Sequence, residues 1–165
     1  KQNLDLILEK IRSFGSKYVC ITGGEPLLQK AVYPLMTQLC DEGFKVSLET
    51  SGDISCEQVD PRVKKIIDVK TPDSGEFGKF SEQNLNFADV NSEFKFVICS
   101  EQDFIWSENF VKQHDLASKT TVLYSPSFRV IDENWLAKKI LSQSSSARLQ
   151  LQLHKYIWSS EMRGV

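Results

Sequence analysis

The chain lacks several features that would define its class at once. Its 165 residues contain four cysteines but no CxxC pair, which disfavours a zinc or iron–sulfur site built from Cys20, Cys40, Cys56 and Cys99. No apolar run approaches the ~20 residues of a membrane-spanning helix, and charges interrupt the N-terminal region where a signal peptide would be apolar. A net charge of −2 provides no excess of positive charge for binding nucleic acid or a membrane surface. These absences favour a globular cytoplasmic protein with four small, buried, free cysteines.

The sequence also has no initiating methionine. It opens inside an amphipathic pattern over residues 4–14 whose apolar positions have helical spacing. We therefore expect a further segment of chain upstream of Lys1.

Short apolar strands alternate with amphipathic helices along the chain. The pattern predicts strands at residues 18–21, 45–49, 66–70, 94–98, 121–124 and 147–153. It predicts helices over 4–14, from Leu27 to near Gly43, after a cap at Ser100 or Asp103, and over 132–142. This alternation predicts an α/β fold in one domain, 1–165, whose strands form a parallel open sheet or a barrel.

Polar residues with glycine or proline follow most of the predicted strands. Hydroxyl-bearing segments at 22–26, 49–52, 70–75 and 125–127 follow the first, second, third and fifth strands. Each segment alone is explained by a turn. Ligands collect at the carboxyl ends of parallel strands, so four such segments at one edge predict a binding rim.

The last predicted strand, RLQLQLH, has an unusual alternation. Its leucines share one face, while Arg148, Gln150, Gln152 and His154 share the other. A parallel strand covered on both faces is apolar throughout. The polar face therefore lines a wet or ligand-filled cavity, or the strand lies at a sheet edge.

The segment TGGEP at 22–26 resembles the radical S-adenosylmethionine (SAM) enzymes, whose GGEP motif holds the amino group of the methionine moiety of SAM. The segments LETSG, IIDVKTPDSGE, KFVICSEQDFIW, YSPSF and LQLQLHKYIW follow in order, and from about residue 18 the chain is similar to the 7-carboxy-7-deazaguanine synthase family. The resemblance implies a partial (β/α) barrel of the radical SAM type. It also implies ring contraction of 6-carboxy-5,6,7,8-tetrahydropterin with loss of ammonia, a homodimer, and a reducing partner such as a flavodoxin.

The resemblance also assigns site residues. It implies pterin contacts for Thr22, Gln152, His154 and the terminal Val165. It implies SAM contacts for Gly23, Gly24, Glu25, Thr50, Ser51, Lys70, Thr71, Ser74, Ser125, Pro126 and Ser127. The residues themselves leave ordinary alternatives open, such as turns at the serines and an ion pair of Lys70 with Asp68 or Glu76.

One departure from the family is clear. The cysteine loop that binds the cluster, a CxxxCxxC-like array, should precede GGEP, and this sequence has none there. The resemblance implies SAM, a [4Fe-4S] cluster and Mg²⁺, so we expect the cluster and magnesium ligands upstream of Lys1. We expect the 165 residues alone to be inactive.

Two other functions remain open. A radical SAM activating enzyme for a protein substrate would share GGEP but would not explain QLHKYIW near the C-terminus. A non-catalytic domain that binds a nucleotide or a partner through the same rim would account for the missing cysteine loop.

Overall fold

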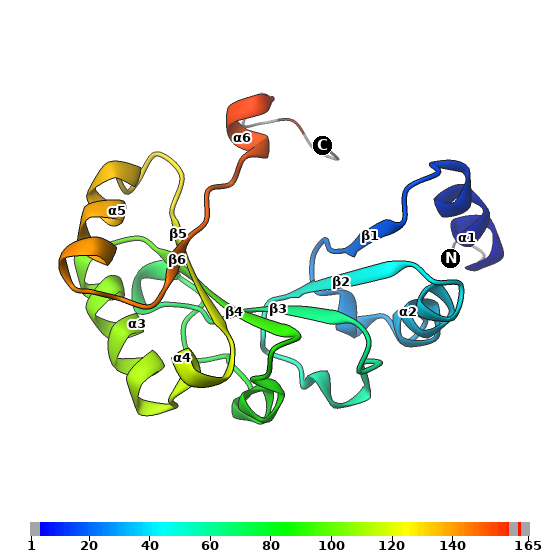
Figure 1. Ribbon diagram of the computed structural model, residues 1–165, viewed down its shortest axis with the longest axis horizontal. Helices are drawn as coiled ribbons and strands as arrows, with labels where there is room; N and C mark the ends of the chain where they lie inside the picture. The colour runs from blue at the N-terminus through cyan, green and yellow to red at the C-terminus, as the bar shows by residue number, and fades with distance from the viewer. Residues whose placement is uncertain (1–3, 159–161, 163–165) are drawn as a thin grey trace.

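The computed structural model describes residues 4–158 and 162. They form one six-stranded sheet in which all neighbouring strands are parallel and follow in chain order (Figure 1). The strands are β1 (Tyr18–Ile21), β2 (Lys45–Thr50), β3 (Lys64–Asp68), β4 (Ser92–Ile98), β5 (Thr121–Pro126) and β6 (Arg148–Leu149). The predicted parallel α/β architecture is confirmed, in its open form.

Helices and short 3₁₀ turns connect the strands, as parallel neighbours require. The helices are α1 (Leu4–Ser13), α2 (Val32–Asp41), α3 (Glu101–Gln113), α4 (Leu116–Lys119), α5 (Glu133–Ser142) and α6 (His154–Ile157). The 3₁₀ turns are η1 (Pro26–Leu28), η2 (Cys56–Gln58), η3 (Pro72–Ser74) and η4 (Glu82–Phe87). None of the helices in the described part of the chain has both the length and the apolar character needed to cross a membrane.

The sheet is curved, and α2 to α5 lie along its outer side (Figure 1). Alternate strand residues point outward into the core beneath these helices. In β4 these are Phe94 and Phe96, both fully buried. The ring of Phe96 packs edge-to-face on Phe110 and Tyr124, at 5.7 Å between ring centroids in each case. Aromatic burial of this kind makes β4 and β5 the centre of the core.

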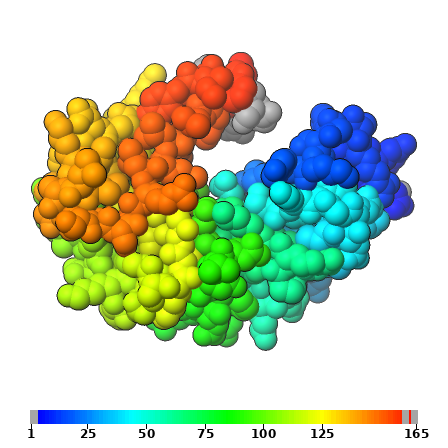
Figure 2. Space-filling model, viewed as in Figure 1, coloured from blue at the N-terminus to red at the C-terminus, as the bar shows by residue number. Residues whose placement is uncertain are grey.

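The inner side of the sheet is polar. Leu48 and Ile67 are buried under the helices, so strand alternation places Glu49 and Asp68 on the opposite face. The pairing of β3 with β4 places Lys95 beside Asp68 on that face. The ammonium nitrogen of Lys95 lies 3.4 Å from Oε2 of Glu49. The space-filling view shows the molecule hollowed between its N-terminal and C-terminal ends (Figure 2). The polar inner face is therefore open to solvent or to a ligand.

The predicted helix from Leu27 is divided. Residues 26–28 form η1, and α2 begins only at Val32. Glu25 caps η1 by accepting a hydrogen bond from the backbone N–H of Leu27 at 2.9 Å, which keeps these residues in a separate turn. The predicted end is confirmed, because Gly43 follows α2 with φ of 80°.

Other boundaries also differ from the sequence prediction. β3 covers Lys64–Asp68 instead of 66–70; its two lysines hide the start of the strand from a hydropathy pattern. Ser100 caps α3, accepting from the N–H of Asp103 at 3.1 Å. Asp103 is therefore not the cap, and its carboxylate is used elsewhere.

The predicted strand over 147–153 is wrong beyond its first residues. β6 has two residues, and a last hydrogen bond joins the N–H of Gln150 to the carbonyl of Tyr124 at 2.9 Å. The next partner along β5 is Pro126, which has no N–H to extend the ladder. His154 instead begins α6, so the alternation of RLQLQLH does not describe a continuous strand.

The prediction that all four cysteines are buried is wrong for one of them. Cys56 is buried and Cys40 and Cys99 are half-buried, but Cys20 is exposed. Cys20 lies on β1, an edge strand of the described sheet, and alternation points it away from the core. The exposure of this position is a consequence of the sheet order.

These differences predict a reactivity order for the thiols. Burial raises the pKa of the Cys56 thiol to about 11, and only the thiolate reacts. Cys20 should be labelled first by a maleimide at pH 7.5, and Cys56 should react on the order of 100-fold more slowly. Mass spectrometry of peptides from timed samples gives both rates. Labelling in urea is the control, since unfolding should make the two rates similar; equal rates in the native protein would contradict the burial of Cys56.

Candidate functional site

A small charged pocket lies where β1, β2 and β3 end. It has a volume of about 230 Å³ and is lined by Gly24, Glu25, Ser51, Asp53, Lys70, Glu76 and Lys79. The loops after the three strands all contribute to it. Parallel neighbours bring the carboxyl ends of their strands to one edge, and this is how segments 50 residues apart come to share a pocket.

Glu25 joins two of these loops. Its Oε1 accepts from the backbone N–H of Leu27 at 2.9 Å, and its Oε2 accepts from the Thr50 hydroxyl at 2.9 Å and the Ser51 N–H at 2.7 Å. Hydrogen bonds to a carboxylate are stronger than neutral ones. Glu25 therefore holds the β1 loop against the β2 loop.

The pocket has an acidic corner, formed by Glu25 and Asp53, where one hydroxyl donor lies between two carboxylates. The Ser51 hydroxyl lies 2.5 Å from Glu25 Oε2 and 2.5 Å from Asp53 Oδ1. A hydroxyl has one proton to donate, so it serves only one of the two carboxylates at a time. A cationic donor such as an ammonium group would complete this corner.

Two lysines, Lys70 and Lys79, also line the pocket. Lys70 Nζ lies 2.8 Å from Asp68 Oδ2, and Lys79 is paired with Glu76 on the loop after β3. The lining of the pocket therefore contains both carboxylates and ammonium groups. A zwitterionic amino acid group has the matching distribution.

Gly24 lines the pocket without a side chain, and the space beside its backbone is empty. Its φ is 52°, and a Cβ built there would meet no atom within 4 Å. The left-handed conformation disfavours other residues, and the empty space lets a ligand approach the backbone.

Some buried side-chain oxygens have no hydrogen-bond partner among the described residues. Among the residues that the structure describes, the buried side-chain atoms without a hydrogen bond are Asp68 Oδ1, Gln152 Oε1 and Ser107 Oγ. An unpaired buried acceptor is costly. Asp68 is the last residue of β3, Gln152 lies between β6 and α6, and Ser107 lies within α3.

Gly52 is tightly confined at the same edge. Its φ is 78°, and an added Cβ would lie 2.8 Å from the Asp68 carbonyl oxygen and 3.1 Å from the Phe80 ring. Backbone cannot yield as a flexible side chain can, so the loop after β2 is held against the end of β3.

Gly52→Ala is therefore expected to destabilise the protein more than Gly75→Ala. Both positions have φ of 78°, but Gly75 has open space around the added Cβ. Placing alanine in this left-handed conformation costs roughly 1 kcal/mol at either position. At Gly52 the close contact of the added Cβ adds about 1–3 kcal/mol. Urea unfolding of the two variants measures the difference, and equal free energies of unfolding would contradict the close packing.

Comparison with known proteins gives the family. No protein-family model matches the chain. It is 39% identical over 166 residues to the 7-carboxy-7-deazaguanine synthase of Chlorobaculum tepidum, covering 98% of this chain and 75% of that protein. The chain belongs to the 7-carboxy-7-deazaguanine synthase family.

A second synthase is also similar in sequence, and one solved structure is similar in fold. The 7-carboxy-7-deazaguanine synthase of Koribacter versatilis is 41% identical over 159 residues, covering 88% of this chain and 70% of that protein. The crystal structure of QueE from Escherichia coli matches with a TM-score of 0.71 at 19% identity. That match covers 92% of this chain and 64% of the QueE chain, so the chain spans less than two thirds of that structure, and the likeness concerns the fold.

The structure brings one group of the predicted SAM contacts together. Gly24, Glu25, Ser51 and Lys70 line the charged pocket, with Gly23 and Thr50 beside it in the chain. Thr50 is buried and donates to Glu25. Lys70 takes the partner that the sequence left open, Asp68.

Other predicted contacts lie apart from the pocket. The Thr71 hydroxyl is fully buried within 2.8 Å of the Val97 carbonyl, and Ser74 donates to the Thr71 carbonyl at 2.6 Å. Ser125 and Pro126 are buried at the end of β5, and the Ser127 N–H donates to the Ile98 carbonyl at 2.9 Å. These contacts stay predictions.

The predicted pterin contacts fall into two places. Thr22 is exposed directly after β1, next to the charged pocket. Gln152 and His154 lie in the C-terminal segment before and in α6. Val165 lies outside the described residues. Thr22 therefore follows the strand at one end of the sheet, and Gln152 and His154 follow the strand at the other end. Their role stays a prediction.

Sequence reasoning missed three residues of the pocket, namely Asp53, Glu76 and Lys79. Asp53 follows SG, and the other two lie in GEFGK, each directly after a glycine. Charged residues beside glycines at a strand end were the available signal. The patterns did not show that these loops fold toward Ser51.

The described residues do not fit an iron–sulfur cluster. Within residues 4–158 and 162, no group of three or more His, Cys, Asp or Glu side chains is placed to hold a metal ion. The cysteines there are free.

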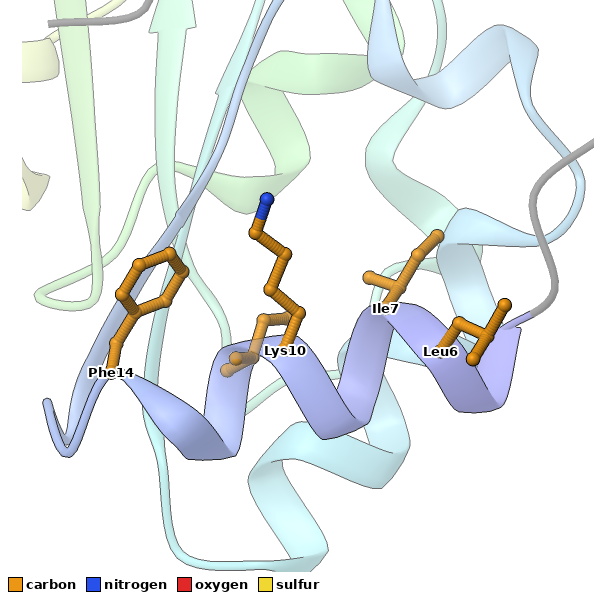
Figure 3. A pocket seen from close by; sticks show the side chains of 5 residues that line it. Leu6, Ile7, Lys10 and Phe14 are labelled. Carbon is orange, nitrogen blue, oxygen red and sulfur yellow. The ribbon is translucent and has the colours of Figure 1, made fainter.

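A larger hollow of about 330 Å³ lies on α1. Figure 3 shows its lining residues along that helix: Leu6, Ile7, Lys10, Ile11 and Phe14. Of the described residues that line it, four are apolar and the fifth is a lysine. A zwitterionic ligand would find no partner for its ammonium group, so this hollow is not part of the candidate site.

Proposed function

We propose that the protein to which this chain belongs converts 6-carboxy-5,6,7,8-tetrahydropterin to 7-carboxy-7-deazaguanine and ammonia, as a lyase of 7-deazapurine and queuosine biosynthesis. The observation that carries this proposal is the charged pocket built by TGGEP, ETSG and DVKTP in a member of the synthase family. Family membership favours this reaction over activation of a protein substrate or non-catalytic binding.

The pocket fits the amino acid end of SAM. Ser51 and Asp53 would receive the ammonium group, with Glu25 behind them, and Lys70 would face the carboxylate. When bound, SAM and a reduced [4Fe-4S] cluster supply the one-electron chemistry that removes a hydrogen atom from the pterin. We place the cluster and Mg²⁺ on residues outside the described ones.

The polar groups left over suit the pterin. Thr22 offers an exposed hydroxyl beside Gly24, and Gln152 Oε1 lacks a donor. His154 and the terminal Val165 would complete the contacts from the C-terminal side. These side chains would orient the ring by hydrogen bonds, which is what a positioned radical reaction requires of the protein.

The cellular setting follows from the same proposal. A radical SAM synthase needs a reducing partner such as a flavodoxin and a compartment that keeps thiols reduced, which favours the cytoplasm. We also propose a homodimer.

The test uses the full-length protein, reconstituted anaerobically with iron and sulfide. Incubation with SAM, reductant and the carboxytetrahydropterin should yield 7-carboxy-7-deazaguanine, identified by mass spectrometry. Omitting SAM should abolish the product. Absence of product from protein with a full cluster, measured by iron content, would refute the reaction.

His154→Ala is expected to weaken pterin binding more than SAM binding. Loss of one hydrogen bond to a polar substrate should raise the KM for the pterin about 10-fold, while the dissociation constant of SAM stays unchanged. His114→Ala is the matched control, because it removes the other histidine at the end of α3. A larger effect on SAM than on the pterin would overturn the assignment of His154.

A further inference from the structure

Asn84 is a fully buried amide that lies outside the charged pocket. It sits in η4 and bonds to the segment after β2. Its Nδ2 donates to the carbonyls of Gly52 and Ile54, each at 3.0 Å, and its Oδ1 accepts from the N–H of Cys56 at 2.9 Å. These partners are 28 to 32 residues earlier in the chain. Both N–H groups of the amide are used on one short stretch of backbone.

That stretch has little other regular structure to hold it. Residues 51–55 lie between β2 and η2, where backbone groups have no strand or helix ladder to join. The N–H of Ser81 adds one hydrogen bond to the Gly52 carbonyl at 2.8 Å. The segment containing η4 therefore supplies a scaffold for the loop.

The loop presents its side chains to the pocket on the other side. Ser51 and Asp53 line the pocket, while the carbonyls of Gly52 and Ile54 point to Asn84. Gly52 is pressed against the Asp68 carbonyl, so the loop has no room to shift toward β3. Rotation of the backbone at Gly52 would displace Ser51 from Glu25.

We infer that Asn84 is a positioning residue for the SAM pocket, acting through the backbone of residues 52–56 to set Ser51 and Asp53 against the ammonium group. This inference rests on the proposed function for the identity of the ligand. Asn84 itself touches neither the pocket nor the reacting atoms. A misplacement of a binding group by about 1 Å can cost on the order of 100-fold, which is why a remote amide matters here.

The experiment compares Asn84→Asp with the wild-type protein. Aspartate keeps the shape and the acceptor for the Cys56 N–H but replaces the donor to Gly52 and Ile54 with an oxygen. Hydrogen exchange of the free protein should show amides of 52–56 exchanging about 10- to 100-fold faster. The dissociation constant of SAM, from anaerobic equilibrium dialysis, should rise about 10-fold or more.

Two further variants keep the inference testable. Ser81→Pro removes only the N–H that bonds Gly52, at a residue whose φ of −79° suits proline, and should give a smaller change in the same direction. Leu136→Ala is the stability control, because Leu136 is fully buried in α5. It should lower the unfolding midpoint without changing SAM affinity.

The outcomes separate the two proposals. A folded Asn84→Asp protein with wild-type exchange at 52–56, or with wild-type SAM affinity, overturns the role of Asn84. A Leu136→Ala protein that loses SAM affinity to the same extent also overturns it, because the effect would then be general. Failure of wild-type protein to bind SAM overturns the proposed function, and the exchange data on the free protein still decide whether Asn84 holds the loop.

Discussion

Glu25→Ala is expected to remove measurable SAM binding and to lower the free energy of unfolding by about 2–4 kcal/mol. The variant leaves the N–H groups of Leu27 and Ser51 and the Thr50 hydroxyl without the acceptor that they now share. The loops after β1 and β2 then lose the contact that joins them. The loss of affinity follows because the acidic corner of the pocket is both weakened and displaced.

Urea unfolding and equilibrium dialysis with SAM measure the two effects. Glu57→Ala is the matched control, since Glu57 is an exposed carboxylate in η2 and its loss should change stability by less than about 0.5 kcal/mol. Glu25→Gln should retain part of the stability, because the amide keeps one acceptor oxygen. Wild-type SAM affinity in Glu25→Ala would show that Glu25 does not organise the pocket.

Asp103→Ala is expected to destabilise the protein more than Glu25→Ala does, and to lower the free energy of unfolding by about 3–5 kcal/mol. The Asp103 carboxylate is fully buried and accepts hydrogen bonds at 3.0 Å from the N–H groups of Asp73 and Cys99. The Thr71 hydroxyl also lies 3.0 Å from it and shares its one proton between Asp103 and the Val97 carbonyl. These bonds join the loops after β3 and β4. Without the carboxylate, buried donors lose their acceptor on both loops.

Thermal unfolding should show a fall in Tm of roughly 10 °C for a chain of this size. Asp132→Ala is the control. Asp132 is an exposed cap of α5 that accepts from the N–H of Trp135 at 2.7 Å, and its loss should cost about 1 kcal/mol. If the two variants have equal Tm values, the buried network around Asp103 does not carry the stability assigned to it.

The sequence predicted the interior of most elements and missed several of their ends. β1 was predicted with its observed bounds because a short apolar run between Lys17 and Thr22 is unambiguous. The start of β3 was missed because Lys65, an amphipathic residue, is buried there. The end of β6 was missed because it depends on Pro126 in the neighbouring strand, which no local pattern reveals.

The candidate site shows the same division. The sequence predicted Gly24, Glu25, Ser51 and Lys70 at strand ends, since parallel topology carries such ends to one edge. Thr71 was grouped with them, yet its hydroxyl is buried against Asp103. In a loop at the strand ends, neighbouring side chains point in different directions, some to the pocket and others to the core. Which direction a given side chain takes depends on contacts with residues about 30 positions away in the chain.

By itself, the amino-acid sequence determined the alternation of strands and helices, the polar strand ends and the TGGEP turn. Local steric preference and hydrophobic periodicity act over a few residues, so a linear pattern records them. Only the tertiary structure decided that Glu25 accepts from the loop after β2, that this loop meets β3 at Gly52, and that Asn84 in η4 bonds to the backbone of the same loop. These contacts join segments about 16 to 32 residues apart, and they exist only once the sheet has brought its strand ends together.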